Sequence, residues 1–458
     1  MMFFYNVLSG KKEKFKPLKG KLVRFYTCGP TVYDYAHVGN LRTYVFDDLL
    51  RRTLKYDGYK VRQVMNITDV DDKIIKRAQK ERKSIKGISV PYTRAFFDDI
   101  KKLNIEKAEV YPKATEHIQE MLSLISKLIK KGVAYKGKDG SIYFDISRFK
   151  KYGKLSRLQK REIKVGARIE ADEYNKEEAQ DFVLWKAKKP GEPSWKSRLG
   201  QGRPGWHIEC SAMSMKYLGA SFDIHTGAVD LLFPHHENEI AQAEAATGKK
   251  FVNYWLEGEH LLINGQKMSK SLKNFFTLRD IEARGFNPLS FKYFTFSTHY
   301  RKKLNFTWDG LVSAENALNK LVNTMAGLYS IKKEKLSPLT SRKVAAYKKD
   351  FMESVNDDLN IPKALNVLWR IVKDRDIPPI SKKELAYNFD EIFGFGLKNV
   401  KPRKTIVPLK IAKLVSQREK FRTNKQFIQA DALRKEVKAL GYRIEDTESG
   451  PRIINGNN

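Results

Sequence analysis

Four side chains of this sequence have the chemical types that bind a soft divalent metal ion. The chain holds only two cysteines, Cys28 and Cys210, and His235 and Glu239 stand four positions apart. Positions four apart lie on one face of a helix, so this imidazole and this carboxylate can hold one ion. Two thiolates, an imidazole and a carboxylate form a ligand mixture that zinc accepts. The alternative is that each residue acts separately, the cysteines as buried apolar residues and the other two as polar residues near a helix N-terminus.

A second group of residues could bind phosphate. His37, Gly39 and Asn40 follow a predicted strand and open a predicted helix. A glycine there lets the backbone approach a ligand, and the helix N-terminus attracts phosphate. Imidazole and amide N–H groups at such a turn can donate to phosphoryl oxygens as negative charge develops. A structural turn with a surface histidine is the alternative for this group alone.

Some 230 positions downstream, a basic loop adds a third group. Lys267 and Lys270 bracket Ser269 in the run Lys-Met-Ser-Lys-Ser, which Asn-Gly precedes. Two lysines in a glycine-started loop are suited to clamp a polyphosphate leaving group. Taken alone, the run is equally typical of a solvated basic loop.

The elements that must position these residues have the pattern of a doubly wound α/β fold. Residues 21–28 alternate and are β-prone, which predicts a strand that ends at Cys28. Helical spacing follows over 41–50, and residues 61–67 predict a second strand. Because ligands bind at the carboxyl ends of parallel strands, Cys28 and Thr68 are expected at a binding edge.

The rest of the chain is expected to add further parts to that sheet. The patterns predict a helix over 116–131, a hairpin around Asp139-Gly140, an insertion over about 150–204, a strand at 222–225, helices from about 312 to 400, and a basic helical hairpin over 418–441. The final 58 residues hold 14 Lys and Arg against six Asp and Glu. This basic end favours contact with nucleic acid.

Composition supports a polyanionic partner. The chain has 458 residues, of which 87 are Lys or Arg and 53 Asp or Glu, for a formal net charge of +34. An excess of this size favours nucleic acid over membrane, although a general bias toward lysine would produce it too. The first residues do not form a secretory signal, and no apolar run approaches the ~20 residues of a membrane span. We therefore expect a soluble, cytoplasmic protein without disulfides, acting as a monomer.

Several longer stretches closely resemble the cysteinyl-tRNA synthetase family of class I aminoacyl-tRNA synthetases. They are Tyr26–Asp34 (YTCGPTVYD), Asn66–Lys73 (NITDVDDK), Gly202–Met213 (GRPGWHIECSAM), Phe233–Gln242 (FPHHENEIAQ) and Lys267–Ser271 (KMSKS). The match covers nearly the whole chain, in the family's order. Asn40 stands where the commonest family form has histidine, and since Asn still donates a hydrogen bond it is interpreted as a tolerated variant.

The resemblance implies a role for each candidate residue. Zinc is expected on Cys28, Cys210, His235 and Glu239. ATP is expected on His37, Gly39, Asn40, Lys267, Ser269 and Lys270, and of these His37, Asn40, Lys267 and Lys270 are expected to be catalytic. The substrate cysteine is expected among Thr68, Trp206, His225 and Asp230. The implied reaction activates L-cysteine with ATP and Mg²⁺ and loads it onto tRNA(Cys).

The resemblance also implies a domain order. The expected parts are a Rossmann-type catalytic domain in two halves (1–115 and 202–258), a connective insertion (116–201), a KMSKS-loop and stem-contact region (259–311), a helical bundle (312–400) and a basic anticodon-binding domain (401–458). Pro451 and Arg452 stand near the end, where the family often has an aromatic residue. The contacts with the anticodon are therefore left open.

Three other functions remain alternatives. A cysteine ligase of mycothiol synthesis shares the fold and the zinc–thiolate chemistry, but it should lack the basic C-terminal segment. A non-catalytic RNA-binding paralogue should have lost the two ATP motifs, which stand nearly intact here. A structural zinc protein usually draws its ligands from short Cys-x-x-Cys knuckles, whereas these four ligands come from three distant segments.

Overall fold

A computed structural model describes residues 1–158, 163–169, 179–268, 274–331, 337–401, 408–447 and 450–455. The chain divides into two compact units, Met1–Asn399 and Val400–Asn458. No helix among the described residues is long and apolar enough to cross a lipid bilayer.

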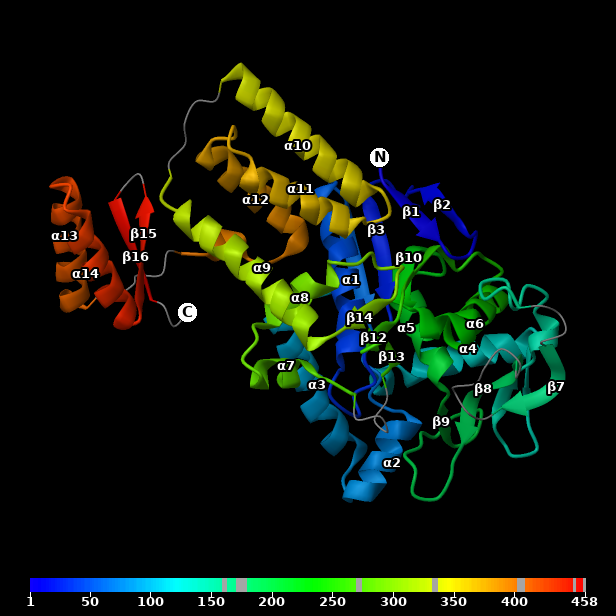
Figure 1. The fold of residues 1–458 in the computed structure, drawn as a ribbon. Coiled ribbons are helices and arrows are strands. Elements are labelled where there is room, and N and C mark those ends of the chain that lie inside the picture. The colour runs from blue at the N-terminus through cyan, green and yellow to red at the C-terminus, as the bar shows by residue number, and fades with distance from the viewer. Residues whose placement is uncertain are drawn as a thin grey trace. The chain divides into compact units, whose positions relative to one another are not determined.

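A four-stranded parallel sheet forms the centre of the first unit, in the order β11-β10-β3-β4 (Figure 1). Its strands are β3 (Leu22–Thr27), β4 (Lys60–Met65), β10 (Phe222–Ala228) and β11 (Val252–Gly258). Tyr26 pairs with His225, and His225 pairs with Trp255 on the other side. This register brings the carboxyl ends of three strands from distant parts of the sequence to one edge. The predicted doubly wound α/β fold is confirmed.

Helices connect these strands and cover the sheet. They are α1 (Val38–Tyr56), α2 (Asp72–Glu81), α3 (Ile85–Lys102), α5 (Trp206–Leu218) and α6 (Glu237–Thr247). Helix α1 packs against β4 and β10 through a buried apolar face that includes Leu41, Val45 and Leu49. Because α1 leads directly from the turn that holds His37, its packing fixes the position of that turn.

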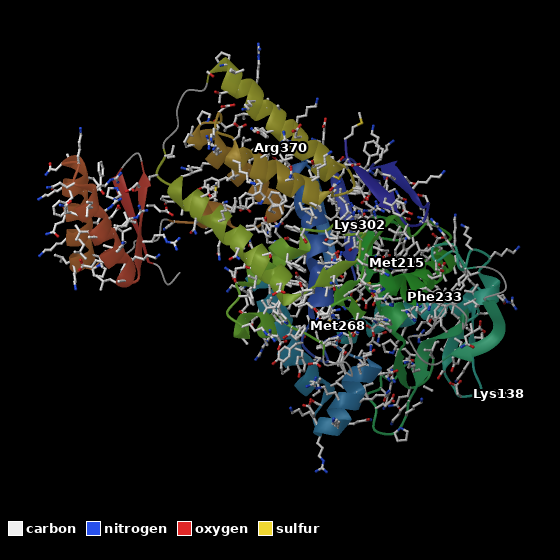
Figure 2. All side chains as sticks on the ribbon, viewed as in Figure 1. Lys138, Met215, Phe233, Met268, Lys302 and Arg370 are labelled. Carbon is white, nitrogen blue, oxygen red and sulfur yellow. The ribbon has the colours of Figure 1, made fainter. Side chains whose placement is uncertain are left out.

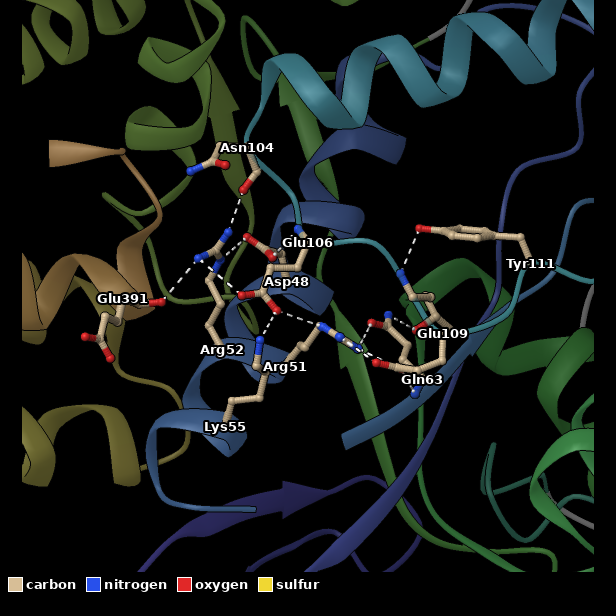
Figure 3. A network of polar contacts seen from close by, with 12 residues as sticks. Asp48, Arg51, Arg52, Lys55, Gln63, Asn104, Glu106, Glu109, Tyr111 and Glu391 are labelled. Carbon is tan, nitrogen blue, oxygen red and sulfur yellow. Dashed lines mark hydrogen bonds and ion pairs between the residues drawn. The ribbon is translucent and has the colours of Figure 1, made fainter. Parts of the chain in front are cut away.

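A buried ion network joins α1 to two helices further along the chain, α8 (Pro288–Thr295) and α12 (Pro379–Phe393) (Figure 3). The carboxylate of Asp48 accepts hydrogen bonds from Arg52 Nε and Lys292 Nζ, each at 2.8 Å. Although burial opposes ionisation, Lys292 and Arg52 hold the pKa of Asp48 below its usual value. Arg52 also donates to the backbone carbonyls of Asn104 and Glu391. Breaking one partner of such a buried pair leaves an uncompensated charge, so the network keeps these elements in one arrangement.

The insertion between β4 and α5 forms a separate small sheet, in the order β5-β6-β8-β7 with β9 on β8. It consists of α4 (Ile118–Lys130), β5 (Ala134–Lys136), β6 (Ile142–Phe144), β7 (Ile163–Ile169), β8 (Ala179–Ala187) and β9 (Gly202–Pro204). The hairpin predicted at Asp139-Gly140 is confirmed, since β5 and β6 pair antiparallel. Phe144, Phe182 and Trp185 join α4 in the core of this part.

In the described part of the first unit, short strands and the helices α7 to α12 follow the last strand of the main sheet. They are β12 (Leu261–Ile263), β13 (Gln266–Lys267), α7 (Leu278–Ala283), α8 (Pro288–Thr295), β14 (Leu304–Phe306), α9 (Trp308–Gly327), α10 (Pro338–Asn356), α11 (Ile361–Lys373) and α12 (Pro379–Phe393). A two-stranded hairpin, β1 (Phe3–Asn6) and β2 (Lys11–Lys14), begins the chain. The helical pattern predicted from about 312 is confirmed.

The second unit combines two helices with a hairpin. It consists of α13 (Leu409–Thr423), α14 (Phe427–Ala439), β15 (Tyr442–Thr447) and β16 (Gly450–Asn455). The predicted helical hairpin is present, but its first helix begins nine residues before Arg418. Arg418 is buried and pairs with both carboxylate oxygens of Asp446, at 2.6 and 2.9 Å, which ties α13 to β15. Phe427, at the start of α14, keeps 61% of its surface exposed.

Candidate active site

A cleft of about 330 Å³ opens at the carboxyl edge of the parallel sheet. Residues from all three sequence groups line it: Cys28, Cys210 and His235 from the first, His37, Gly39 and Asn40 from the second, and Lys267 from the third. Parallel α/β sheets bind their ligands at this edge. The structure therefore brings three of the four proposed metal ligands and four of the residues expected to bind ATP into one cavity.

The four proposed metal ligands converge at the inner end of the cleft. One ligand atom from each of Cys28, Cys210, His235 and Glu239 lies within 4.8 Å of the others, and all four residues are buried. The sequence argument placed His235 and Glu239 on one helix. In the structure α6 begins at Glu237, and His235 lies in the wide helical turn before it (Leu232–His236). The two side chains still meet, with Nε2 of His235 3.1 Å from Oε1 of Glu239.

The electrostatics of these groups fit a divalent cation. Burial opposes ionisation, but the hydrogen bond with Cys28 and the positive charge of His235 lower the pKa of the Cys210 thiol to about 6. Burial acts against protonation of His235 as well, yet Cys210 and Glu239 raise its pKa to about 10. Burial and Cys210 raise the pKa of Cys28 well above its usual value. The cluster thus holds protons among closely spaced donor atoms. A metal ion that binds to such atoms displaces these protons.

A second, overlapping set of donors shares Cys28 and Glu239 and adds His225 and His236. The ring nitrogens of these two histidines are engaged: His236 Nδ1 lies 2.7 Å from Oε1 of Glu257, and His225 Nε2 lies 3.1 Å from Oε2 of Glu239. His235 presents its Nε2 to Oε1 of Glu239 within the first set, while its Nδ1 lies 2.9 Å from Nδ1 of His207. With two thiols and Nε2 of His235, the set of Cys28, Cys210, His235 and Glu239 is the better fit to a soft ion such as zinc.

The second set then surrounds the first. His236 Nε2 lies 3.5 Å from the sulfur of Cys28, and the His225 ring stacks on Trp255 at 4.6 Å between centroids. Although burial opposes ionisation, His225 and His235 hold the pKa of Glu239 well below its usual range. Groups that hydrogen-bond to metal ligands fix the orientation of those ligands.

His37 and Asn40 form a reciprocal cap at the start of α1. The backbone N–H of Asn40 donates to Nδ1 of His37 at 3.1 Å, and the backbone N–H of His37 donates to the side-chain oxygen of Asn40 at 3.2 Å. Since Nδ1 accepts, the proton of the neutral imidazole sits on Nε2. The histidine can therefore donate from Nε2 while its other nitrogen caps the helix. Asparagine in place of the family's common histidine keeps this cap, because its carbonyl oxygen is the acceptor.

The loop that carries Lys267 is tied to the same turn. The backbone N–H of Val38 donates to the carbonyl of Phe276 at 2.9 Å, and the Phe275 ring meets the His37 ring edge-on at 5.1 Å. A side chain at Gly39 would lie 2.9 Å from the His37 ring and 3.6 Å from the end of Met268, so only glycine leaves room here. Met268, labelled in Figure 2, packs on the main core. Ser269 and Lys270 lie outside the described residues.

Of the four residues expected around the substrate cysteine, two line the cleft and two are fully buried. Trp206 and Asp230 line the cleft, and the Trp206 ring packs on His235 at 4.0 Å between centroids. Thr68 is fully buried and donates to the carboxylate of Glu209 at 3.2 Å. His225 is also fully buried, against Trp255 and Glu239.

Sequence reasoning assigned no role to His236 or Glu257. His236 directly follows a proposed ligand, and Glu257 comes just before the carboxyl end of β11, where a buried carboxylate is unusual. Burial and Asp230 raise the pKa of Glu257 well above its usual range. An acidic residue near the end of a mostly apolar strand was the signal that could have identified it.

Comparisons with known proteins show the family to which the chain belongs. Residues 14–316 match the family described as the class I (C) tRNA synthetase catalytic domain. A cysteine–tRNA ligase of Leptospira interrogans is 48% identical, with 98% of each chain covered. A cysteine–tRNA ligase of Chlamydia caviae is 45% identical over 99% of this chain and 97% of its own. Among solved structures, Mycobacterium tuberculosis methionyl-tRNA synthetase in complex with methionyl-adenylate shares the fold, with a TM-score of 0.60, 14% identity, and coverage of 84% of this chain and 92% of that chain. The chain therefore belongs to the class I aminoacyl-tRNA synthetases, in the family of the cysteine–tRNA ligases.

Proposed function

We propose that the chain is a cysteine–tRNA ligase, which activates L-cysteine with ATP and transfers it to the 3′ end of tRNA(Cys). One observation carries the proposal: a buried set of two thiols, an imidazole and a carboxylate opens into the same cleft as His37 and Lys267. An amino acid held by its sulfur at the inner end then has its carboxylate directed toward the phosphate-binding residues. We infer that the reaction takes place in the cytoplasm, where tRNA is charged for translation.

The proposed metal set accounts for the choice of amino acid. Cysteine and serine differ by one atom, and a pocket of apolar side chains separates such near-isosteres by only about 10²-fold. Zinc held by Cys28, Cys210, His235 and Glu239 would take a thiolate in preference to a neutral hydroxyl. Trp206 and Asp230 line the cleft beside this set, where the carboxylate of Asp230 is suited to the substrate's ammonium group.

Activation is a displacement at the α-phosphorus of ATP. A carboxylate oxygen of cysteine forms a bond to phosphorus, and the bond to the leaving diphosphate breaks. His37 donates from Nε2 to the phosphates, the amide of Asn40 adds N–H donors, and Lys267 neutralises the leaving group. Mg²⁺ arrives with ATP and shares that charge. We include Lys270 in this group from the family motif.

Transfer then joins the activated cysteine to tRNA. The terminal ribose hydroxyl, the 2′-OH by resemblance to class I enzymes, attacks the carbonyl carbon of cysteinyl-adenylate and AMP leaves. The phosphate of the adenylate is a suitable acceptor for the hydroxyl proton. The basic second unit, with Phe427 exposed on α14, supports RNA as the acceptor in preference to an amino sugar, because aromatic and cationic side chains are what unpaired bases stack on.

Removing the residues after Asn399 tests whether RNA is the acceptor of the activated cysteine. Since the two units are compact by themselves, the shortened protein should keep cysteine-dependent ATP–diphosphate exchange within about twofold. Its kcat/KM for charging tRNA(Cys) should fall about 100-fold or more, because base stacking and phosphate contacts are lost together. Charging is measured as acid-precipitable radiolabelled cysteine. Full charging by the shortened protein would contradict the proposed role of the second unit, and equal loss of exchange would show that the unit is needed for folding.

A further inference from the structure

Two arginines and two tyrosines stack in a row at the rim of the active-site cleft. The guanidinium of Arg279 lies over the Tyr35 ring, 4.0 Å from its centroid, and that of Arg77 lies over the Tyr92 ring at 4.7 Å. The two tyrosine rings meet edge to face at 5.1 Å. Arg279 lies on α7, Arg77 on α2, Tyr35 in the turn before α1, and Tyr92 on α3. These four side chains are here called the Arg–Tyr ladder.

Ion pairs hold both arginines of the ladder in place. Arg77 pairs with Glu81 at 2.7 Å and also donates to the backbone carbonyl of Tyr33. Arg279 pairs with Asp99 at 3.1 Å, and the carboxylate of Asp99 is fully buried. The planes of the guanidinium groups are thus set by neighbouring contacts. A ladder preorganised in this way loses little conformational freedom when a further planar group joins it.

The ladder borders an open space that continues into the catalytic cleft. A cavity of about 300 Å³ lies beside it, lined by Tyr35, Tyr92, Arg279, Arg94 and Lys83 among others. Tyr35 and Tyr92 line the catalytic cleft as well. Tyr35 keeps 39% of its surface exposed, so the ring is not enclosed by its arginine and tyrosine neighbours. The volume is in the range of small-ligand sites.

Position along the chain relates the ladder to the reacting atoms. Tyr35 stands two residues before His37, a separation of at most about 7 Å between the two Cα atoms. Arg279 stands on α7, which follows the loop of Lys267. A molecule bound to the ladder therefore lies close to the substrate group that reacts in the catalytic cleft. It lies on the route by which that group enters the cleft.

We propose that the Arg–Tyr ladder stacks an unpaired base of the tRNA 3′ end, the base next to the terminal adenosine. The inference rests on the proposed function, in which the terminal ribose reacts beside His37. Unpaired RNA bases stack on aromatic rings and on arginine planes, and the ladder offers both kinds of surface, in the order Arg279, Tyr35, Tyr92, Arg77. Arg94 at the cavity wall suits the phosphates that join such a base to its neighbours, whereas Lys83 pairs there with Glu81 at 2.8 Å and Asp98 also lines the wall.

Binding of two tRNA transcripts tests the ladder directly. One is full-length tRNA(Cys), and the other lacks the last two nucleotides; both carry a fluorophore at the 5′ end, and anisotropy is measured at fixed salt without ATP or cysteine. Wild-type protein should bind the full-length transcript about tenfold more tightly, the effect of one base stack. Tyr35→Ala should weaken the full-length complex by about the same factor and leave the shortened one within twofold. Tyr35→Phe keeps the ring and should keep the difference.

Tyr329→Ala is the matched control, since Tyr329 is a tyrosine of similar exposure (41%) away from the cleft. It should change neither complex. Equal weakening of both transcripts by Tyr35→Ala would overturn the proposal and show that the ladder only braces α7, and so would equal binding of the two transcripts by wild-type protein. Cysteine-dependent ATP–diphosphate exchange needs no tRNA, so its failure would reject the proposed function, whereas loss of the transcript difference with exchange intact rejects only the ladder.

Discussion

Replacing Cys210 by serine should remove bound zinc and cysteine activation together. We expect Cys210→Ser to hold less than about one tenth of the wild-type zinc and to lose about 100-fold or more in kcat/KM for cysteine-dependent exchange. A serine hydroxyl stays protonated at neutral pH and is a poor ligand for zinc, whereas the pKa of the Cys210 thiol is already lowered to about 6. Cys210 is 1% exposed, so the hydroxyl also lies where water has little access. Metal content by atomic emission and exchange on the same preparation give the two values.

Ser214→Ala is the matched control for Cys210→Ser. Ser214 lies one helical turn further along α5, is equally buried, and donates only to the backbone carbonyl of Ser211. It should keep both zinc and activity. Normal zinc and normal exchange in Cys210→Ser would remove Cys210 from the ligand set. The metal would then be assigned to Cys28, His225, His236 and Glu239, and His236→Asn should release it.

The second large effect is expected at His37, whose two roles can be separated. His37→Ala removes both the helix cap and the Nε2 donor, and should lower the kcat of cysteine-dependent exchange by about 10²–10³-fold. His37→Asn keeps a side chain that caps helices well. Asparagine has no N–H donor at the position of the histidine Nε2. This variant should therefore have the thermal stability of the wild type and the low activity of His37→Ala. Wild-type exchange in His37→Asn would show that His37 serves only as the cap of α1.

The sequence predicted the residues of the site better than it predicted their surroundings. Cys28 and Cys210 were the only cysteines, and His235 and Glu239 had a spacing that suggested one ion, so ligand chemistry suggested the set that the structure brings within 4.8 Å, and the family resemblance then implied it. His236 and Glu257 could not be selected in this way. Their meeting depends on the register of β10 and β11, and a parallel register is set by packing across the whole sheet.

The same distinction applies to the fold. The main sheet was predictable because β3 and β4 are β-prone stretches with alternating residues and flank a helix with regular spacing. The hairpin β15–β16 was missed: its strand Tyr442–Thr447 alternates only weakly and carries Arg443, Glu445 and Asp446. What holds it is the ion pair of Asp446 with Arg418 and the packing of Ile444 on α13 and α14, contacts that depend on tertiary structure. Strands β7, β8 and β9 of the insertion were missed for a similar reason, since the stretch of about 150–204 is polar overall.

The most direct test of the central claim is amino-acid-dependent ATP–diphosphate exchange on zinc-loaded protein, with cysteine and serine compared at equal concentration. We predict exchange with cysteine and a kcat/KM for serine that is lower by about 10³-fold or more, beyond what an apolar pocket alone achieves. Exchange with neither amino acid, from folded protein that holds one zinc ion, would contradict the account and favour an RNA-binding paralogue that has lost catalysis. Equal exchange with both would contradict selection through the thiolate.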